Sequence, residues 1–198
     1  MYLNILINII IMNTLSLIGK GGFVREIYHH FNKHNYIKIN IVNDIDNNLL
    51  NIKNSNFLIC IGNTLERENI YNKYNKLSYF TYIHDNHNNL DNNNIIGTGS
   101  IICRGSILTT NIILGNHCQI NLNCTIGHDV KIGNFVTCSP GVNISGNCII
   151  GNNVLIGTNS SIKENITICN NVVIGMGSVV TKNINEPGIY IGCPAKKI

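Results

Sequence analysis

A histidine and a carboxylate that could act together stand side by side in the second half of the chain, at His128 and Asp129. An imidazole beside a carboxylate can take a proton from a nucleophile, because the carboxylate orients the ring and stabilises the imidazolium. Gly146 follows His128 by 18 residues, and an exposed glycine N–H can stabilise an oxyanion. These are the parts of an acyl-transfer site, if the fold brings residues 128 and 146 together. The alternative is a surface histidine beside a turn glycine.

A six-residue repeat predicts a fold that brings residues 128 and 146 together. Every sixth residue from Ile96 to Val180 is Ile, Leu or Val, except Cys138, and the position two before is small or β-branched in most repeats. This period fits neither an α-helix nor an alternating strand, but it is typical of a hexapeptide β-helix. Three hexads form one coil of 18 residues, so residues 96–180 predict almost five coils with no large loop. Residues 18 apart then stack about 4.8 Å apart, which places Gly146 beside His128.

The repeat also assigns the turns and the cysteines. Glycine and asparagine are expected to supply unusual backbone angles at four pairs: Gly115-Asn116, Gly133-Asn134, Gly146-Asn147 and Gly151-Asn152. Four of the eight cysteines fall on inward positions and are expected to pack in the core: Cys118, Cys124, Cys138 and Cys148. None of the eight forms a C-x-x-C pair, so no common zinc or disulfide pattern is present.

The first half of the chain alternates strands and helices instead. Strands are expected at 15–18, 37–42, 57–61 and 78–83, and helices from 23 to about 35 and from 64 to about 76, with Thr64 as a cap. This order predicts a small parallel sheet with right-handed crossovers. Ligands of such sheets bind beyond the carboxyl ends of the strands, which here carry Gly19–Gly22, Asn43-Asp44 and Gly62-Asn63. Glycines at a helix N-terminus would let a phosphate approach backbone N–H groups.

Composition narrows the class of protein. The chain has 37 Asn and 38 Ile among 198 residues, a bias towards AT-rich codons, so a single Asn or Ile has little weight as a signal. A net charge of +4 with 12% charged residues points away from nucleic acid, and 44% hydrophobic residues argue against disorder. The apolar stretch from Tyr2 to Met12 is too short to span a membrane and lacks the features of a signal peptide. A cytoplasmic protein with free thiols is expected, with Met12 as an alternative start.

Further motifs occur in a fixed order along the chain: Gly19-Lys20-Gly21-Gly22-Phe23, Ile61-Gly62-Asn63 with Arg67, Ile83-His84, Asn121, Gly127-His128-Asp129 and Gly192-Cys193-Pro194-Ala195-Lys196. Over residues 13–198 the chain resembles the sugar-nucleotide acyltransferases of the left-handed β-helix superfamily. Its nearest members are the N-acetyltransferases of UDP-4-amino-4,6-dideoxy sugars, as in bacillosamine synthesis, and the sialic acid O-acetyltransferase-like proteins.

The resemblance implies an α/β, Rossmann-like N-terminal domain followed by an all-β left-handed parallel β-helix. The implied division is an extension at 1–12, a nucleotide-sugar-binding domain at 13–84, a linker at 85–94, the β-helix at 95–184 and a tail at 185–198 that closes the coenzyme groove. The protein would be a homotrimer with acetyl-CoA between neighbouring β-helices and a UDP-amino sugar as acceptor. No metal, nucleic acid or membrane is implied.

The resemblance also assigns roles to individual residues. His128 would be the general base with Asp129 as its acidic neighbour, Asn121 would lie near the acceptor, and the Gly146 N–H would face the thioester. Six residues match nucleotide-binding positions: Gly21, Gly22, Asn43, Asp44, Gly62 and Asn63. The coenzyme groove would include Gly146, Thr158, Gly175, Pro194 and Lys196, with Lys196 or Lys197 meeting phosphates.

Four positions depart from the family pattern. Thr137 stands where close members often have a second histidine, Val24 replaces a glycine, Asn43 replaces an aspartate and Asp85 replaces a proline. Thr137 bears on the coenzyme contacts, and the changes in the first domain bear on the identity of the sugar.

Three rival functions remain open: O-acetylation of a sugar hydroxyl, a γ-class carbonic anhydrase and a non-catalytic trimer that binds a sugar nucleotide. The carbonic anhydrase would need three zinc-binding histidines, whereas the coils contain only His117 and His128.

Overall fold

The computed structural model describes residues 14–32, 38–43, 52, 55–84 and 90–198. The expected extension at 1–12, Asp44, Asp85 and the first half of the expected linker lie outside this range. The chain divides into two compact units, one of Met1–Gly62 with Glu66–Phe80 and one of Asn63–Leu65 with Thr81–Ile198. Among the described residues, no helix combines the length and the apolar character that crossing a membrane requires.

The first unit contains the small parallel sheet that the sequence predicts. Strands β1 (Thr14–Ile18), β2 (Lys38–Val42) and β3 (Asn56–Ile59) pair in the order β2-β1-β3, and all pairs are parallel. Helix α2 (Gly22–Asn32) follows β1 and helix α3 (Thr64–Lys73) follows β3. The central strand β1 is buried from Leu15 to Ile18, as expected for a parallel strand that is covered on both faces.

The predicted fourth strand of this sheet, at 78–83, is divided between the two units. Tyr79 makes only an isolated bridge to Phe57, whereas β4 (Tyr82–Ile83) pairs in parallel with β6 (Ile101–Ile102) of the repeat region. The Tyr82 N–H donates to the Ser100 carbonyl at 2.9 Å, which takes the chain into the β-helix. The main part of the second unit accordingly starts at Thr81, earlier than the boundary expected after residue 84. It also includes the end of the expected linker, where buried Asn94 donates to the Thr109 carbonyl.

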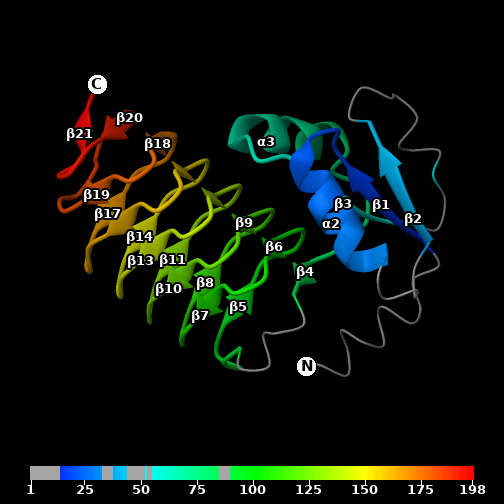
Figure 1. The fold of residues 1–198 in the computed structure, drawn as a ribbon, viewed down its shortest axis with the longest axis horizontal. Helices are drawn as coiled ribbons and strands as arrows, with labels where there is room; N and C mark the ends of the chain where they lie inside the picture. The colour runs from blue at the N-terminus through cyan, green and yellow to red at the C-terminus, as the bar shows by residue number, and fades with distance from the viewer. Residues whose placement is uncertain (1–13, 33–37, 44–51, 53–54, 85–89) are drawn as a thin grey trace. The chain divides into compact units, whose positions relative to one another are not determined.

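The second unit is a parallel β-helix with one short strand in each hexad (Figure 1). The strands are β5 (Ile95–Ile96), β6 (Ile101–Ile102), β7 (Ile107–Leu108), β8 (Ile113–Leu114), β9 (Gln119–Ile120), β10 (Thr125–Ile126), β11 (Lys131–Ile132), β12 (Thr137–Cys138), β13 (Asn143–Ile144), β14 (Ile149–Ile150), β15 (Leu155–Ile156), β16 (Ser161–Ile162), β17 (Thr167–Ile168), β18 (Val172–Ile174) and β19 (Val179–Val180). Fifteen strands at three per coil make the five coils that the repeat predicts.

Three stacked sheets form the faces of the β-helix. The first face is β7-β10-β13-β16-β19 and the second is β5-β8-β11-β14-β17. The third face runs from β4 through β6, β9, β12, β15 and β18 to two strands of the C-terminal segment, β20 (Gly188–Ile191) and the antiparallel β21 (Lys196–Lys197). Every partner within a face is 18 residues away from β5 to β19, for example Thr125 beside Asn143.

The core of the β-helix is the column of inward side chains that the period predicts. Ile120, Ile156 and Ile174 are fully buried, as are the four inward cysteines, Cys118, Cys124, Cys138 and Cys148. Burial raises the pKa of the Cys124 thiol to about 11 and raises the pKa of Cys138 as well. These thiols therefore remain protonated and behave as small apolar side chains.

The corners follow a rule that the sequence predicted only in part. A residue with positive φ occurs every six positions from Gly99 to Gly177, and most of these residues are asparagine or glycine. Of the four Gly-Asn pairs expected to supply this conformation, only Asn147 has it. Asn116, Asn134 and Asn152 instead form a ladder in which each side-chain oxygen accepts the N–H of the residue one coil earlier, at 2.7–2.9 Å. Asn170 accepts from Asn152 in the same way.

Position 115 requires glycine because neighbouring coils approach closely there. The φ angle of Gly115 is not positive, so its backbone conformation is not the reason. A Cβ at Gly115 would lie 2.6 Å from the backbone carbonyl of Gly133 on the next coil. We expect Gly115→Ala to lower the free energy of unfolding by about 1–3 kcal/mol, measured by thermal or urea unfolding followed by circular dichroism. Gly62→Ala is the matched control, because a Cβ there meets nothing within 4 Å. Equal stability of the two variants would contradict this reason for the glycine.

Candidate active site

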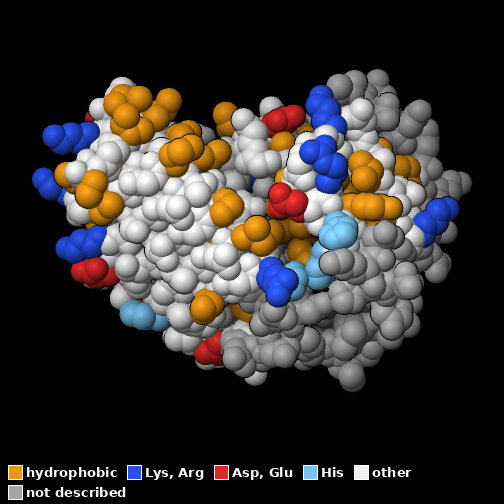
Figure 2. All heavy atoms as spheres, in the orientation of Figure 1, with side chains coloured by type: hydrophobic (Ala, Val, Ile, Leu, Met, Phe, Trp, Pro, Cys, Tyr) orange, Lys and Arg blue, Asp and Glu red, His pale blue; other side chains and the backbone are white. Residues whose placement is uncertain are grey.

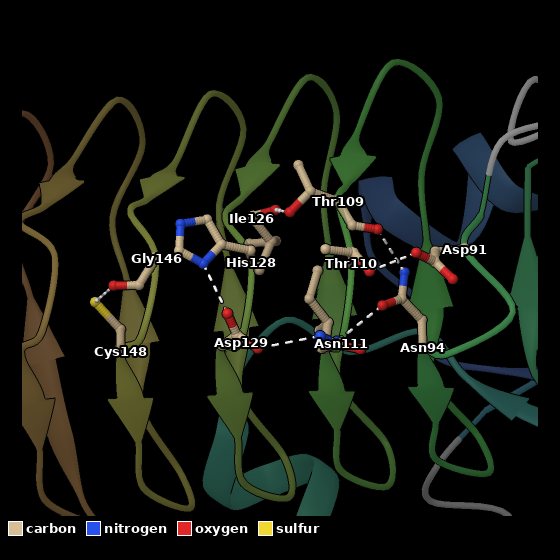
Figure 3. A network of polar contacts seen from close by, with 11 residues as sticks. Asp91, Asn94, Thr109, Thr110, Asn111, Ile126, His128, Asp129, Gly146 and Cys148 are labelled. Atoms are coloured by element: carbon tan, nitrogen blue, oxygen red, sulfur yellow. Dashed lines mark hydrogen bonds and ion pairs between the residues drawn. The ribbon is translucent and has the colours of Figure 1, made fainter.

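His128 and Asp129 lie at the corner between β10 of the first face and β11 of the second (Figure 3). Asp129 has φ 61°, a left-handed conformation that aspartate tolerates better than most residues. In this conformation its Oδ2 atom lies 2.8 Å from Nδ1 of His128. The side chains are 58% and 47% exposed, so the pair faces solvent.

The second carboxylate oxygen of Asp129 also has a partner. Asn111, one coil earlier, donates from Nδ2 to Oδ1 of Asp129 at 3.3 Å. The hydrogen bond from His128 and, next, that from Asn111 hold the pKa of Asp129 below its usual value. An ionised carboxylate only accepts hydrogen bonds, so a neutral His128 must carry its proton on Nδ1 to form this contact. Nε2 is then the free base.

Gly146 lies against the outer end of the His128 ring, as the coil spacing predicts. A Cβ at Gly146 would be 2.6 Å from both Cε1 and Nε2 of the imidazole. The Gly146 carbonyl accepts the Asn165 N–H at 3.1 Å, whereas within the described part of the chain the Gly146 N–H donates to no protein acceptor. A base and a hydrogen-bond donor without a protein partner therefore lie next to each other.

Asn121, Thr158 and Gly175 lie at another corner, between the third face and the first. Asn121 follows β9 and donates from Nδ2 to the Cys138 carbonyl at 3.0 Å. The Thr158 carbonyl accepts the Gly177 N–H at 2.8 Å. Strand β10 separates Asn121 from His128 along the coil, so one chain does not bring these residues to the imidazole.

The C-terminal segment lies at this second corner too. A Cβ at Gly175 would lie 2.6 Å from Cγ2 of Ile191 in β20. Exposed apolar side chains gather at this end of the β-helix (Figure 2), among them Val173, Met176, Ile189 and Ile191. Pro194 is exposed within this segment.

The two lysines of the segment differ in their contacts. Lys197 donates to Glu186 at 2.9 Å, and this contact raises the pKa of Lys197 and lowers the pKa of Glu186. Lys196 is exposed and makes no ion pair with any described residue. Lys196 is therefore the better candidate for binding a phosphate.

The expected nucleotide positions lie at the carboxyl edge of the first sheet. Gly21, Gly22, Asn43, Gly62 and Asn63 are all exposed there, after β1, β2 and β3. A Cβ at Gly21 or Gly62 would meet no atom of a described residue within 4 Å, so both backbones are open to a ligand.

Two other residues shape this edge. Gly19 has φ 145°, and a Cβ there would lie 2.9 Å from the Cys60 carbonyl, so this position requires glycine. Arg67 is fully buried and donates to the Ile61 carbonyl at 2.6 Å, which fixes the loop before Asn63.

Two more residues, Thr137 and His117, bear on whether a second histidine contributes to the site. Thr137, at the position of the family's second histidine, is buried on the third face. His117 is also buried and stacks on Phe135, at a corner other than that of His128. Within the ranges that the structure describes, no three His, Cys, Asp or Glu side chains are grouped closely enough to hold a metal ion.

The sequence reasoning missed Asn111. Its distance from Asp129 is 18 residues, one full coil, so the same rule that pairs His128 with Gly146 could have found it.

Comparisons with known proteins agree with this architecture. Residues 147–182 match the bacterial transferase hexapeptide family (six repeats). No curated protein sequence matches the chain significantly. Among solved structures, the acetyltransferase domain of PglB from Neisseria gonorrhoeae FA1090, in complex with acetyl coenzyme A, matches with a TM-score of 0.82 and 23% identity over 94% of this chain and 99% of that one.

Two further structures match over nearly the whole chain. A histidine-to-asparagine mutant of perosamine N-acetyltransferase from Caulobacter crescentus, in complex with CoA and GDP-perosamine, has a TM-score of 0.84 at 19% identity and covers 94% of this chain and 97% of that one. WeeI from Acinetobacter baumannii AYE has a TM-score of 0.78 at 23% identity, with 93% and 99% covered. The chain thus has the two-part fold of these proteins, a small parallel α/β sheet followed by a left-handed β-helix. Its later coils carry the transferase hexapeptide repeat.

Proposed function

We propose that this protein is an acetyltransferase that moves the acetyl group of acetyl-CoA to an amino group on the sugar of a sugar nucleotide. The observation that carries the proposal is the position of Gly146, one coil away, against the imidazole of the His128–Asp129 dyad. The fold shared with an acetyl-CoA complex and with a GDP-perosamine complex supports it.

The dyad can perform the transfer directly. The neutral amine of the acceptor attacks the thioester carbon, so that a C–N bond forms and the C–S bond breaks. Nε2 of His128 takes the proton that the amine loses, and Asp129 stabilises the imidazolium. The Gly146 N–H donates to the carbonyl oxygen while it carries negative charge. CoA leaves as a thiolate, which the imidazolium or water then protonates.

The acceptor we favour is a UDP-4-amino-4,6-dideoxy sugar. The open glycine backbone at Gly21, directly before α2, and at Gly62, two residues before α3, supports binding of nucleotide phosphates. The alternative acceptor is a sugar hydroxyl, which the same base could deprotonate. A non-catalytic trimer that binds a sugar nucleotide is the second alternative, and it gives no use to the Gly146 N–H beside Nε2.

We also propose that the protein works as a homotrimer. The proposed coenzyme residues Thr158, Gly175 and Lys196 lie at a different corner from His128 within one chain. Both corners border the first face, so a neighbouring copy could supply the missing set. Analytical ultracentrifugation tests this proposal: we expect a species of three chains, and a monomer with full activity would contradict it.

A thiol assay of CoA release tests the proposed activity. We expect release with acetyl-CoA and a UDP-4-amino-4,6-dideoxyglucose, with or without a 2-acetamido group, and none without acceptor or with His128→Ala. The corresponding GDP- and dTDP-amino sugars and a hydroxyl acceptor compare the alternatives. Acetyl-CoA binding without release on any amine would shift the assignment to a hydroxyl. Sugar-nucleotide binding without acetyl-CoA binding would support the non-catalytic alternative.

A further inference from the structure

A chain of hydrogen bonds runs from Asn111 through Asp129 to His128 and crosses from one coil to the next (Figure 3). Asp129 uses Oδ2 for His128 and Oδ1 for Asn111, so both of its oxygens are engaged. An exposed carboxylate held by one contact can rotate about its last bond, whereas two contacts on different oxygens fix its plane. The Asn111 contact therefore decides how rigidly Asp129 presents Oδ2 to the imidazole.

The coil that carries Asn111 is itself anchored. The Thr110 hydroxyl donates to the Asp91 carboxylate, and the Thr110 carbonyl accepts the Asp129 N–H at 3.0 Å. The next residue, Ile112, donates its N–H to Oδ1 of buried Asn94 at 2.8 Å. Asn111 thus lies between two residues that are tied to the segment from Asp91 to Asn94, and its position under Asp129 is well defined.

Asn111 also suits the left-handed backbone conformation of this corner. Its φ is 56°, and asparagine, aspartate and glycine adopt this conformation most readily. Glycine would satisfy the backbone but could not donate to Asp129, and aspartate would place a second negative charge there. Asparagine is the residue of the three that meets both needs.

We propose that Asn111 is a positioning residue that acts on His128 through Asp129. By donating to Oδ1, it holds the carboxylate so that Oδ2 keeps the proton of the imidazole on Nδ1 and leaves Nε2 unprotonated beside Gly146. The kinetic part of this proposal rests on the proposed acetyltransferase function, whereas the structural part does not.

Among the described residues, few other charged side chains lie near the His128–Asp129 pair, which simplifies the interpretation of a titration. Asp91 lies on the same side of the pair as Asn111 and accepts a hydrogen bond from the Thr110 hydroxyl. Lys131 follows Asp129 by two residues at the outer position of β11. On the far side of Gly146, the neighbouring coil carries Lys163 and Glu164, which pair with each other at 3.8 Å. None of these groups changes in the variants below.

The test is a pH titration of the His128 ring by ¹⁵N NMR on the full chain, with the signal assigned by its loss in His128→Ala. In the unchanged protein we expect the neutral ring to carry its proton on Nδ1. In Asn111→Gly we expect a mixture of the two neutral forms. In Asn111→Asp the added negative charge should raise the midpoint of the His128 titration by about half a pH unit. Asn171→Gly is the matched control, since Asn171 has φ 59° at another corner.

The kinetic arm uses the same variants. We expect Asn111→Gly to lower kcat about three- to tenfold with the KM for acetyl-CoA unchanged. We expect Asn111→Asp to move the acidic limb of kcat/KM to higher pH, and Asn171→Gly to do neither. An Asn111→Gly protein that keeps the imidazole proton on Nδ1 alone, or that keeps an unchanged kcat, would overturn the proposal. If neither the unchanged protein nor any variant transfers acetyl, the proposed function fails, and the NMR arm alone decides whether Asn111 positions the ring.

Discussion

Replacing His128 with alanine is expected to lower kcat for acetyl transfer by about 10²–10⁴-fold, the usual contribution of a general base. The structure gives three reasons. The imidazole is oriented by Asp129 through a 2.8 Å contact, its Nε2 lies beside Gly146, whose N–H donates to no acceptor among the described residues, and the ring is exposed to solvent. Because an amine is a better nucleophile than a hydroxyl, the loss should be smaller with an amino sugar than with a hydroxyl acceptor.

Stability measurements separate this loss from a loss of fold. The ring is 58% exposed, so the melting temperature and the binding of acetyl-CoA should be preserved in His128→Ala. His29→Ala is the control, because His29 is exposed in the last turn of α2 and no step uses it. A His128→Ala protein with full kcat would remove this residue from the mechanism.

Gly146→Ala is expected to lower kcat by about a hundredfold, although the N–H of residue 146 is retained. The new Cβ would lie 2.6 Å from Cε1 and Nε2 of His128, a separation that atoms in proteins do not adopt. The contact is with the end of a side chain, so the imidazole should swing away while the coils stay in place. The base is then displaced from the reacting amine, and misplacement by about 1 Å can cost on the order of 10²-fold.

A double-mutant cycle tests whether the loss in Gly146→Ala passes through the ring. In a His128→Ala background the Cβ has no imidazole to displace, and adding Gly146→Ala should lower kcat little further. An equally large loss in that background would show that the methyl group blocks the acyl donor itself. Gly146→Ala with the kcat of the unchanged protein would contradict the close packing of this glycine against His128.

The period of six was enough to predict most of the β-helix. It identified the inward column, the buried cysteines and the number of coils, because each inward residue is constrained by its neighbours 18 positions away. The same spacing placed Gly146 beside His128. These features depend on residue type and register alone, and register does not shift anywhere between residues 96 and 180.

Other features were missed because they depend on atomic contacts. Tyr82–Ile83 has the composition of a strand in either unit, and only the available edge of β6 decides that it joins the β-helix. The Gly-Asn pairs were read as turn conformations, whereas Gly115 is needed for close approach and Asn116 for the ladder. Asn111 was missed, because asparagine is so common in this chain that a single one has little weight, although its spacing from Asp129 marked it.

The stacking of identical coils has a consequence for how this site survives partial unfolding. In a linear array each coil is stabilised mainly by the coils above and below it, so opening starts at an end and proceeds inward. On the first face, β10 leads to the His128 corner and β13 leads to the Gly146 corner. These two strands have β7 on one side and β16 and β19 on the other. Fraying of the terminal coil at β19 therefore leaves β16 still covering β13, whereas opening from the other end at β7 uncovers β10 first. Backbone amides of the His128 coil should therefore exchange hydrogen for deuterium faster than those of the Gly146 coil.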